Sequence, residues 1–204
     1  MSRRARAVMN LSALPDVVFG PRDIMWWGTM GFVVIEGFTL VLTAAVYLYV
    51  QQNFATWPPE GTPNPDLLVP TIQVVVMLLS LPLVWWIHKV AHRFEFEKVR
   101  LGLTVAAVVN AVFVVLRLVE AISSLNVKWD TNAYGSAQWL ILGSHFTLLA
   151  IELVEVTGMA LMFWLAPIEE KHFSDAADMA FYWFFMVLSW VPLYVLCFLV
   201  PRWI

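Results

Sequence analysis

Long apolar stretches separated by short polar connections organise the chain. Each stretch is close to the roughly 20 residues that a helix needs to cross the hydrocarbon core of a bilayer, and none alternates like a barrel strand. Because backbone polar groups inside a membrane must be satisfied within the segment, such stretches favour helices. The pattern predicts five transmembrane helices, at about Met25–Val50, Thr71–Ile87, Leu103–Ile122, Ala137–Leu165 and Met179–Val200.

The spacing of these stretches predicts an all-α bundle without internal linkers. Proline, glycine and asparagine, which interrupt helices, gather in the first connection, from Trp57 to Pro70. We divide the chain into an amino-terminal arm, residues 1–24, and one transmembrane domain, residues 25–204. We expect no cleaved signal peptide before the first span, and the lack of matched halves disfavours an inverted-repeat transporter.

Composition supports the membrane assignment. The 204 residues are 61% hydrophobic and 13% charged, against about 25% charged in soluble domains, and the mean hydropathy is +0.76. The net charge of −3, without a basic face, excludes nucleic-acid binding. The single cysteine, Cys197, excludes an internal disulfide and a cysteine-based metal cluster.

The positive charges predict an orientation. With the amino terminus inside, the inner segments hold nine Lys and Arg residues and the outer segments hold two, Lys128 and Arg202. This asymmetry places the amino terminus in the cytoplasm and the carboxyl terminus outside. Tryptophans near the span ends are expected to anchor the helices at the headgroups: Trp26, Trp27, Trp57, Trp85, Trp86, Trp129 and Trp203.

Ionisable side chains inside the spans are the candidate functional groups. A charge at the bilayer centre costs about 2.5 to 3.5 kcal/mol, so these groups should face the bundle interior and have partners. Arg117 and Glu120 are three residues apart and can neutralise each other, while His145, Glu152 and Glu155 share one helix stripe. The full set is Glu36, Arg117, Glu120, His145, Glu152 and Glu155.

Glu36 lies beside Gly28, Gly31 and Gly37 on a small-residue face that lets a neighbouring helix approach. Four interpretations of the polar set compete: a metal site, a proton relay, a face for lipid headgroups or a partner subunit, and charges that only hold the bundle together. We favour the lipid or partner face. The Glu-x-x-His repeats of a di-iron site are missing, and no nucleophile with its base is visible. The chain is predicted to be non-catalytic.

Several short motifs occur in a defined order. The first connection reads Trp57-Pro58-Pro59-Glu60-Gly61-Thr62-Pro63-Asn64-Pro65, followed by Val69-Pro70, and a later stretch reads Ala133-Tyr134-Gly135-Ser136. The last span carries Tyr182-Trp183, Phe185, Trp190 and Tyr194. Together they resemble subunit III of haem-copper (cytochrome c type) oxidases, over about residues 25–201. Glu36, Glu120, Gly143 and His145 match the family's glutamates, glycine and histidine.

The chain resembles a divergent, five-helix bacterial form that lacks the first two of the family's seven helices. Leu148 stands where the family has a second histidine, and Phe184 and Val187 replace a His-Phe-x-Asp pattern. Arg117, Glu152 and Glu155 are additional polar groups. A related interpretation is a subunit III homologue associated with nitric oxide reductase, which the Asp23 and Met25-Trp26 segment also resembles.

The resemblance implies an accessory subunit without haem or copper of its own. Both would lie in partner subunits, with subunit I the main contact and subunit II a second. Phospholipid would bind in an intramembrane cleft and help to maintain proton uptake and dioxygen reduction, in the inner (cytoplasmic) membrane of a bacterium. The expected lipid- or partner-binding residues are Glu36, Arg117, Glu120, His145, Glu152, Trp57, Tyr182 and Trp183.

Within this set, Glu36 and His145 are expected to line the cleft, and Arg117 and Glu120 to steady it. Two alternatives of other classes stay open: a small proton-coupled transporter or relay that uses Glu152 and Glu155, and a purely structural membrane scaffold.

Overall fold

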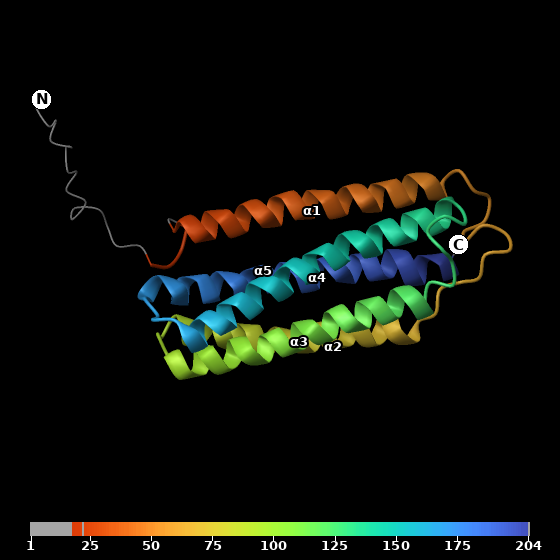
Figure 1. The fold of residues 1–204 in the computed structure, drawn as a ribbon. Helices are drawn as coiled ribbons and strands as arrows, with labels where there is room; N and C mark the ends of the chain where they lie inside the picture. Colours follow the sequence, from red (N-terminus) through yellow and green to blue (C-terminus); the bar gives the residue numbers. More distant parts are fainter. Residues whose placement is uncertain (1–17, 22, 204) are drawn as a thin grey trace, which may run out of the picture.

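The computed structural model describes residues 18–21 and 23–203 (Figure 1). The described residues form helices and contain no strand, which confirms the predicted all-α bundle. All five long helices are apolar enough and long enough to cross a membrane. They are α1 (Ile24–Gln51), α2 (Leu68–Ala91), α3 (Phe96–Ser123), α4 (Ala133–Leu165) and α5 (Glu170–Tyr194).

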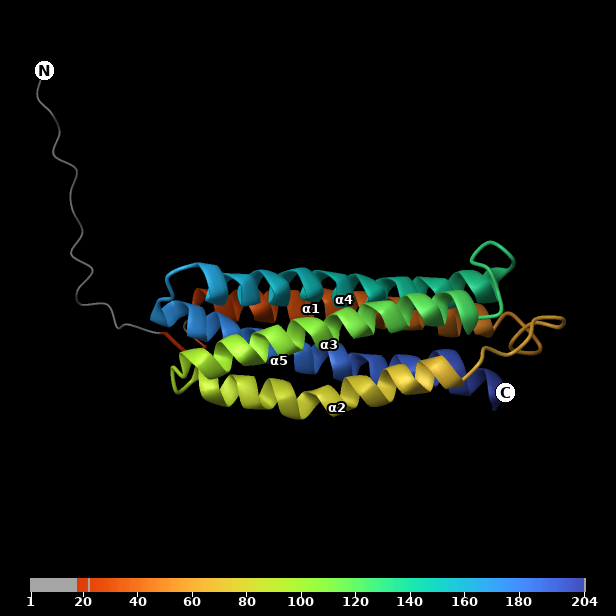
Figure 2. The same ribbon diagram turned by 60° about the horizontal axis from the view of Figure 1, so that its bottom comes forward.

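The helices run up and down beside one another (Figures 1 and 2). α3 packs between α2 and α4, while α5 contacts all four other helices. α1 packs only against α4 and α5 in substantial contacts and leaves most of its surface free of the bundle. The large aromatic side chains of α3, α4 and α5, among them Phe113, Phe163, Trp183 and Trp190, fill the core.

Helices α3 and α5 begin well before the apolar stretches that predicted them. α3 begins at Phe96, seven residues before the predicted start, and α5 begins at Glu170, nine residues before it. Charged residues end a hydrophobic run but not the backbone hydrogen bonding of a helix, so these turns continue beyond the hydrocarbon. At the other end of α5, Pro192 lacks an N–H, and helical turns of other types follow at Val195–Leu199 and Val200–Arg202.

Capping side chains fix the starts of α1 and α4. Asp23 accepts a hydrogen bond from the Met25 N–H, and Asn132 accepts one from the Gly135 N–H at 2.8 Å. Gly135 also passes so close to the loop before α4 that an added Cβ would lie 2.3 Å from the Lys128 carbonyl oxygen. The Tyr-Gly-Ser stretch therefore requires glycine for steric reasons.

The predicted arm, residues 1–24, lies largely outside the described residues. The same holds for Arg3, Arg4, Arg6 and Arg22, which contribute to the predicted orientation. The cytoplasmic location of the amino terminus therefore stays a prediction. Below, we call the end of the bundle where α1, α3 and α5 begin the entry end.

Candidate functional site

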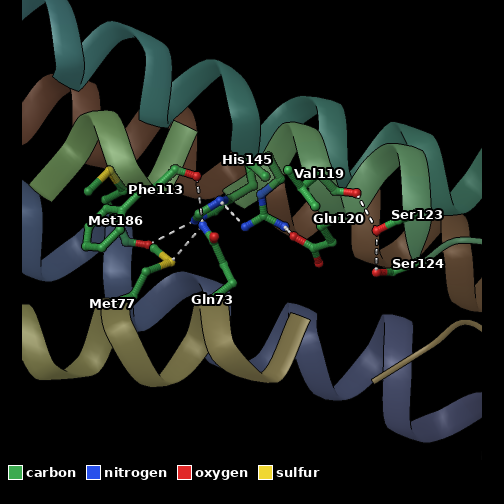
Figure 3. Close-up of polar contacts among 10 residues, drawn as sticks. Gln73, Met77, Phe113, Val119, Glu120, Ser123, Ser124, His145 and Met186 are labelled. Carbon is green, nitrogen blue, oxygen red and sulfur yellow. Dashed lines mark hydrogen bonds and ion pairs between the residues drawn. The ribbon is translucent and has the colours of Figure 1, made fainter. Parts of the chain in front are cut away.

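A charged cluster lies inside the bundle, between α3, α4 and α5. The Arg117 guanidinium donates to Glu120 at 2.8 Å and to Nδ1 of His145 at 3.2 Å. It also stacks on Trp190, with the guanidinium carbon 3.5 Å from the ring centroid. Figure 3 marks these contacts with dashed lines that end at Glu120 and at His145. All of these side chains are buried. The ion pair between Arg117 and Glu120 confirms the predicted pairing.

Hydrogen bonding fixes the form of His145. Arginine has only donors, so Nδ1 of His145 accepts from Arg117, and Nε2 carries the hydrogen that it donates to the Met186 carbonyl at 3.0 Å. His145 is therefore a neutral imidazole that links α3, α4 and α5. Because it is fully buried, it does not line a cleft that is open to lipid, in contrast to our expectation.

Glu36 belongs to a second, separate site. The hydroxyl of Tyr182 on α5 donates to the Glu36 carboxylate on α1. Glu36 is half-buried. The next residue, Gly37, lines a groove of about 440 Å³ between α1 and α5. Leu40, Val41, Phe185 and other apolar side chains line this groove.

The small-residue face around Glu36 packs only in part. A Cβ added to Gly37 would contact the Phe185 ring at 3.4 Å, but one added to Gly28 or Gly31 would meet nothing within 4 Å. The prediction that a neighbouring helix of this chain approaches closely at Gly28 and Gly31 is therefore wrong. These two glycines keep the surface of α1 open.

Glu152 and Glu155 lie on the stripe of α4 that the sequence predicted, but their surroundings differ. Glu152 is fully buried, and among the described residues neither of its carboxylate oxygens has a hydrogen-bond partner. Glu155 is exposed at the protein surface and borders a small cavity of about 110 Å³ with Tyr182. Among the described residues, neither carboxylate forms a hydrogen bond or ion pair with the Arg117 cluster.

Two of the predicted tryptophans have structural partners. The Trp183 indole donates to Ser80 at 2.9 Å and joins α5 to α2. Trp57 is only 4% exposed, and its indole donates to Tyr47 at 2.8 Å while its ring packs on Tyr134. The expectation that Trp57 is a headgroup anchor is therefore wrong, because the first connection packs this side chain against Tyr47 and Tyr134. The anchors Trp27, Trp129 and Trp203 are exposed, as expected.

Sequence reasoning missed several members of these sites. The last-span motif contains Trp190 but does not indicate its contact with Arg117. The predicted site also lacks three buried amides, Gln73, Asn110 and Gln138. Gln73 donates to the Phe113 carbonyl and thereby joins α2 to α3 (Figure 3). The available signal was an amide inside an apolar run, which is costly in a membrane unless it has a role.

In the described part of the chain, no group of three or more His, Cys, Asp or Glu side chains has an arrangement that would hold a metal ion. The polar residues instead form two pair-type sites, one around Arg117 and one around Glu36.

Comparison with known proteins decides the family. The sequence profile of cytochrome c oxidase subunit III matches residues 16–202. The chain belongs to the cytochrome c oxidase subunit III family. The subunit is therefore a multi-pass membrane protein of a family of accessory subunits, which confirms the resemblance found in its motifs.

Relatives named cytochrome c oxidase subunit 3 span bacteria and animals. The protein of the cyanobacterium Synechocystis is 22% identical over 187 residues, which cover 88% of this chain and 77% of the relative. That of the sea urchin Paracentrotus lividus is 28% identical over 148 residues, 69% of this chain and 54% of the relative. That of Anopheles quadrimaculatus is 25% identical over 181 residues, covering 83% and 66%. The chain thus spans between about half and three quarters of the length of these relatives.

Proposed function

We propose that this chain is the non-catalytic accessory subunit of a haem-copper terminal oxidase. It stabilises the catalytic subunit and holds phospholipid, while dioxygen reduction takes place at the haem and copper of partner subunits. The observation that carries this proposal is the family match over residues 16–202. The internal pairing of Arg117, Glu120 and His145 supports it, because these groups serve the bundle and leave its outer faces to lipid and partners.

We infer that one lipid site is the groove between α1 and α5. Its walls are almost wholly apolar from Leu40 to Leu196, which suits an acyl chain. The Glu36–Tyr182 pair lies one residue beyond Gly37, at the side of the groove nearer the entry end. An acyl chain in this groove would cover apolar side chains of α1 and α5 that otherwise face the membrane.

The partners in this proposal are oxidase subunits I and II, and the membrane is the cytoplasmic membrane of a bacterium. α1 supports a partner contact, because it is the least buried of the five helices. A helix that is apolar on nearly all sides needs lipid or another protein around it.

Glu36→Ala tests the function. Removal of the carboxylate leaves Tyr182 without its acceptor and changes the groove wall, but it leaves the α3–α4–α5 core intact. We expect normal assembly and fewer turnovers before the oxidase inactivates, measured as oxygen uptake by the purified complex in lipid vesicles. Glu36→Gln keeps an acceptor for Tyr182, so its working life should lie between those of Glu36→Ala and the wild type. Glu170→Gln, at an exposed site, should behave like the wild type. A normal working life in Glu36→Ala would contradict the proposal.

A further inference from the structure

Carboxyl groups line one side of the bundle, where α1, α4 and α5 meet. On α5, Asp175, Asp178 and Tyr182 follow one another at intervals of three and four residues, so they share one face. Tyr182 donates to Glu36 on α1 and borders the same small cavity as Glu155 on α4. Three helices thus contribute acidic or hydroxyl groups to one side of the bundle. These groups are called the path below.

The path begins at the entry end and leads inward. Tyr182 and Glu36 each lie twelve residues from the start of their helices, or about 18 Å along the axis at 1.5 Å per residue. Asp178 lies one turn nearer the entry end, and one of its carboxylate oxygens is buried without a partner among the described residues. Asp23, which accepts from Ser174 at 2.8 Å, marks the outermost step.

Glu152 lies at the inner end of this path. It is one helical turn beyond Glu155, and the carboxyl groups that act on it electrostatically are those of Glu155 and Glu36. Its side chain is fully buried, with both oxygens unpartnered among the described residues. An unpartnered buried polar group destabilises a fold, so its presence in the middle of an apolar helix requires a reason.

The register of α3 against α4 supplies a neighbour for Glu152. Arg117 contacts His145 across this antiparallel pair. Seven residues along each helix, which is two turns on the same face, the equivalent positions are Asn110 and Glu152. Asn110 is also fully buried, and neither its amide nitrogen nor its oxygen has a partner in the described part of the chain. Four buried polar atoms without partners at one height are what internal water binds to in folded proteins.

We propose that Glu152 is a proton-binding site inside the membrane, which exchanges protons with the entry end through Asp178, Glu155 and Glu36. In each step an O–H bond of the donor, a hydrated proton or a carboxylic acid, breaks, and an O–H bond forms at the accepting carboxylate oxygen. Uptake converts Glu152 from a carboxylate to a neutral acid, and release reverses this. No oxidation or reduction is involved.

Among the described residues, the path ends at Glu152. The ionisable groups that act electrostatically on Glu152 or are acted on by it are Glu36 on α1, Tyr182 on α5 and Glu155 on its own helix. Asn110 on α3 is in register with Glu152. The next titratable group along α4 is His145, about 10 Å further at 1.5 Å per residue, with the buried Leu148 and Leu149 between. Nδ1 of His145 is occupied by Arg117.

The inference goes beyond the accessory function, since proton exchange at Glu152 requires no particular partner. Infrared spectroscopy of the complex purified through this subunit tests it, with D₂O as the probe. A protonated carboxylic acid has a carbonyl-stretch band that shifts on deuteration. We expect the wild type to show such a band and to exchange it rapidly, Glu152→Gln to remove it, and Glu152→Asp to keep it at a shifted position.

The path is tested by the exchange rate of that band. Asp178→Asn and Glu155→Gln should each slow exchange by at least about tenfold, equivalent to about 1.4 kcal/mol in the barrier. Glu170→Gln, at an exposed site in the first turn of α5, is the matched control and should leave the rate unchanged.

Two outcomes overturn the proposal. If Glu152→Gln leaves every carboxylic acid band in place, Glu152 does not carry the proton. If the band of Glu152 exchanges at the wild-type rate in both path variants, Glu152 is a structural acid and no path exists. Neither result bears on the accessory function, which is tested separately by the working life of the Glu36 variants.

Discussion

The ion pair of Arg117 and Glu120 offers a quantitative test of the buried cluster. Arg117→Met removes three interactions at once: the contacts with Glu120, with His145 and with the Trp190 ring. It leaves the Glu120 carboxylate buried, with no other partner among the described residues. Breaking one side of a buried pair costs about 3–5 kcal/mol, so we expect a loss of that size.

The double substitution distinguishes pairing from simple burial. Arg117→Met combined with Glu120→Leu replaces both charges by apolar side chains, which is often neutral for buried pairs. We expect the double variant to lose about 1–3 kcal/mol, because Nδ1 of the buried His145 has lost its donor, which is far less than the sum of the two single losses. The measurement is equilibrium unfolding of the purified chain in mixed micelles, followed by tryptophan fluorescence.

α3 supplies its own control. Glu97 and Arg100 form a second pair with the same three-residue spacing, but the Glu97 side chain is 71% exposed. Glu97→Gln should therefore cost less than about 1 kcal/mol. Additive losses in the Arg117 and Glu120 variants, or equal losses at Glu97 and Glu120, would refute our account of the cluster.

Two further predictions concern the bundle ends. Gly135→Ala should destabilise the fold by about 1–3 kcal/mol because the new methyl group clashes with the Lys128 carbonyl. Gly143→Ala, where the added methyl group meets open space, should stabilise the fold by up to about 1 kcal/mol. Thermal unfolding compares the two variants, and equal effects would contradict the close approach at Gly135. At the turn before α3, a hydrogen bond from Lys98 lowers the pKa of the Glu95 carboxylate. This contact stabilises the turn at neutral pH and is lost as pH falls through that lowered pKa, so Lys98→Gln should raise the pKa of Glu95 toward its ordinary value in a carboxyl NMR titration; an unchanged titration would count against the contact.

The sequence predicted what depends on local periodicity. Five apolar runs gave five helices, and the three-residue spacing of Arg117 and Glu120 gave their ion pair, because neighbours on one helix face are set by the helix geometry alone. The helix starts at Phe96 and Glu170 were placed too late, because hydropathy marks the edge of the hydrocarbon and not the end of backbone hydrogen bonding.

Contacts between helices could not be predicted in this way. The bond from Arg117 to His145 depends on the register of α3 against α4, and the bond from Tyr182 to Glu36 joins residues 146 positions apart. Trp57 has the position of a headgroup anchor, but the fold buries it against Tyr47 and Tyr134. Only the packed structure separates His145 from Glu36, which the sequence had placed in one cleft.

The most direct test of the central claim is gentle detergent extraction of the tagged chain from its native membrane. Visible spectra and protein identification are then recorded on what accompanies it. We predict a haem-bearing catalytic subunit in the same complex, with oxygen uptake that follows the tag. A colourless chain recovered alone, which moves a proton-coupled substrate when reconstituted by itself, would contradict the assignment as an oxidase accessory subunit.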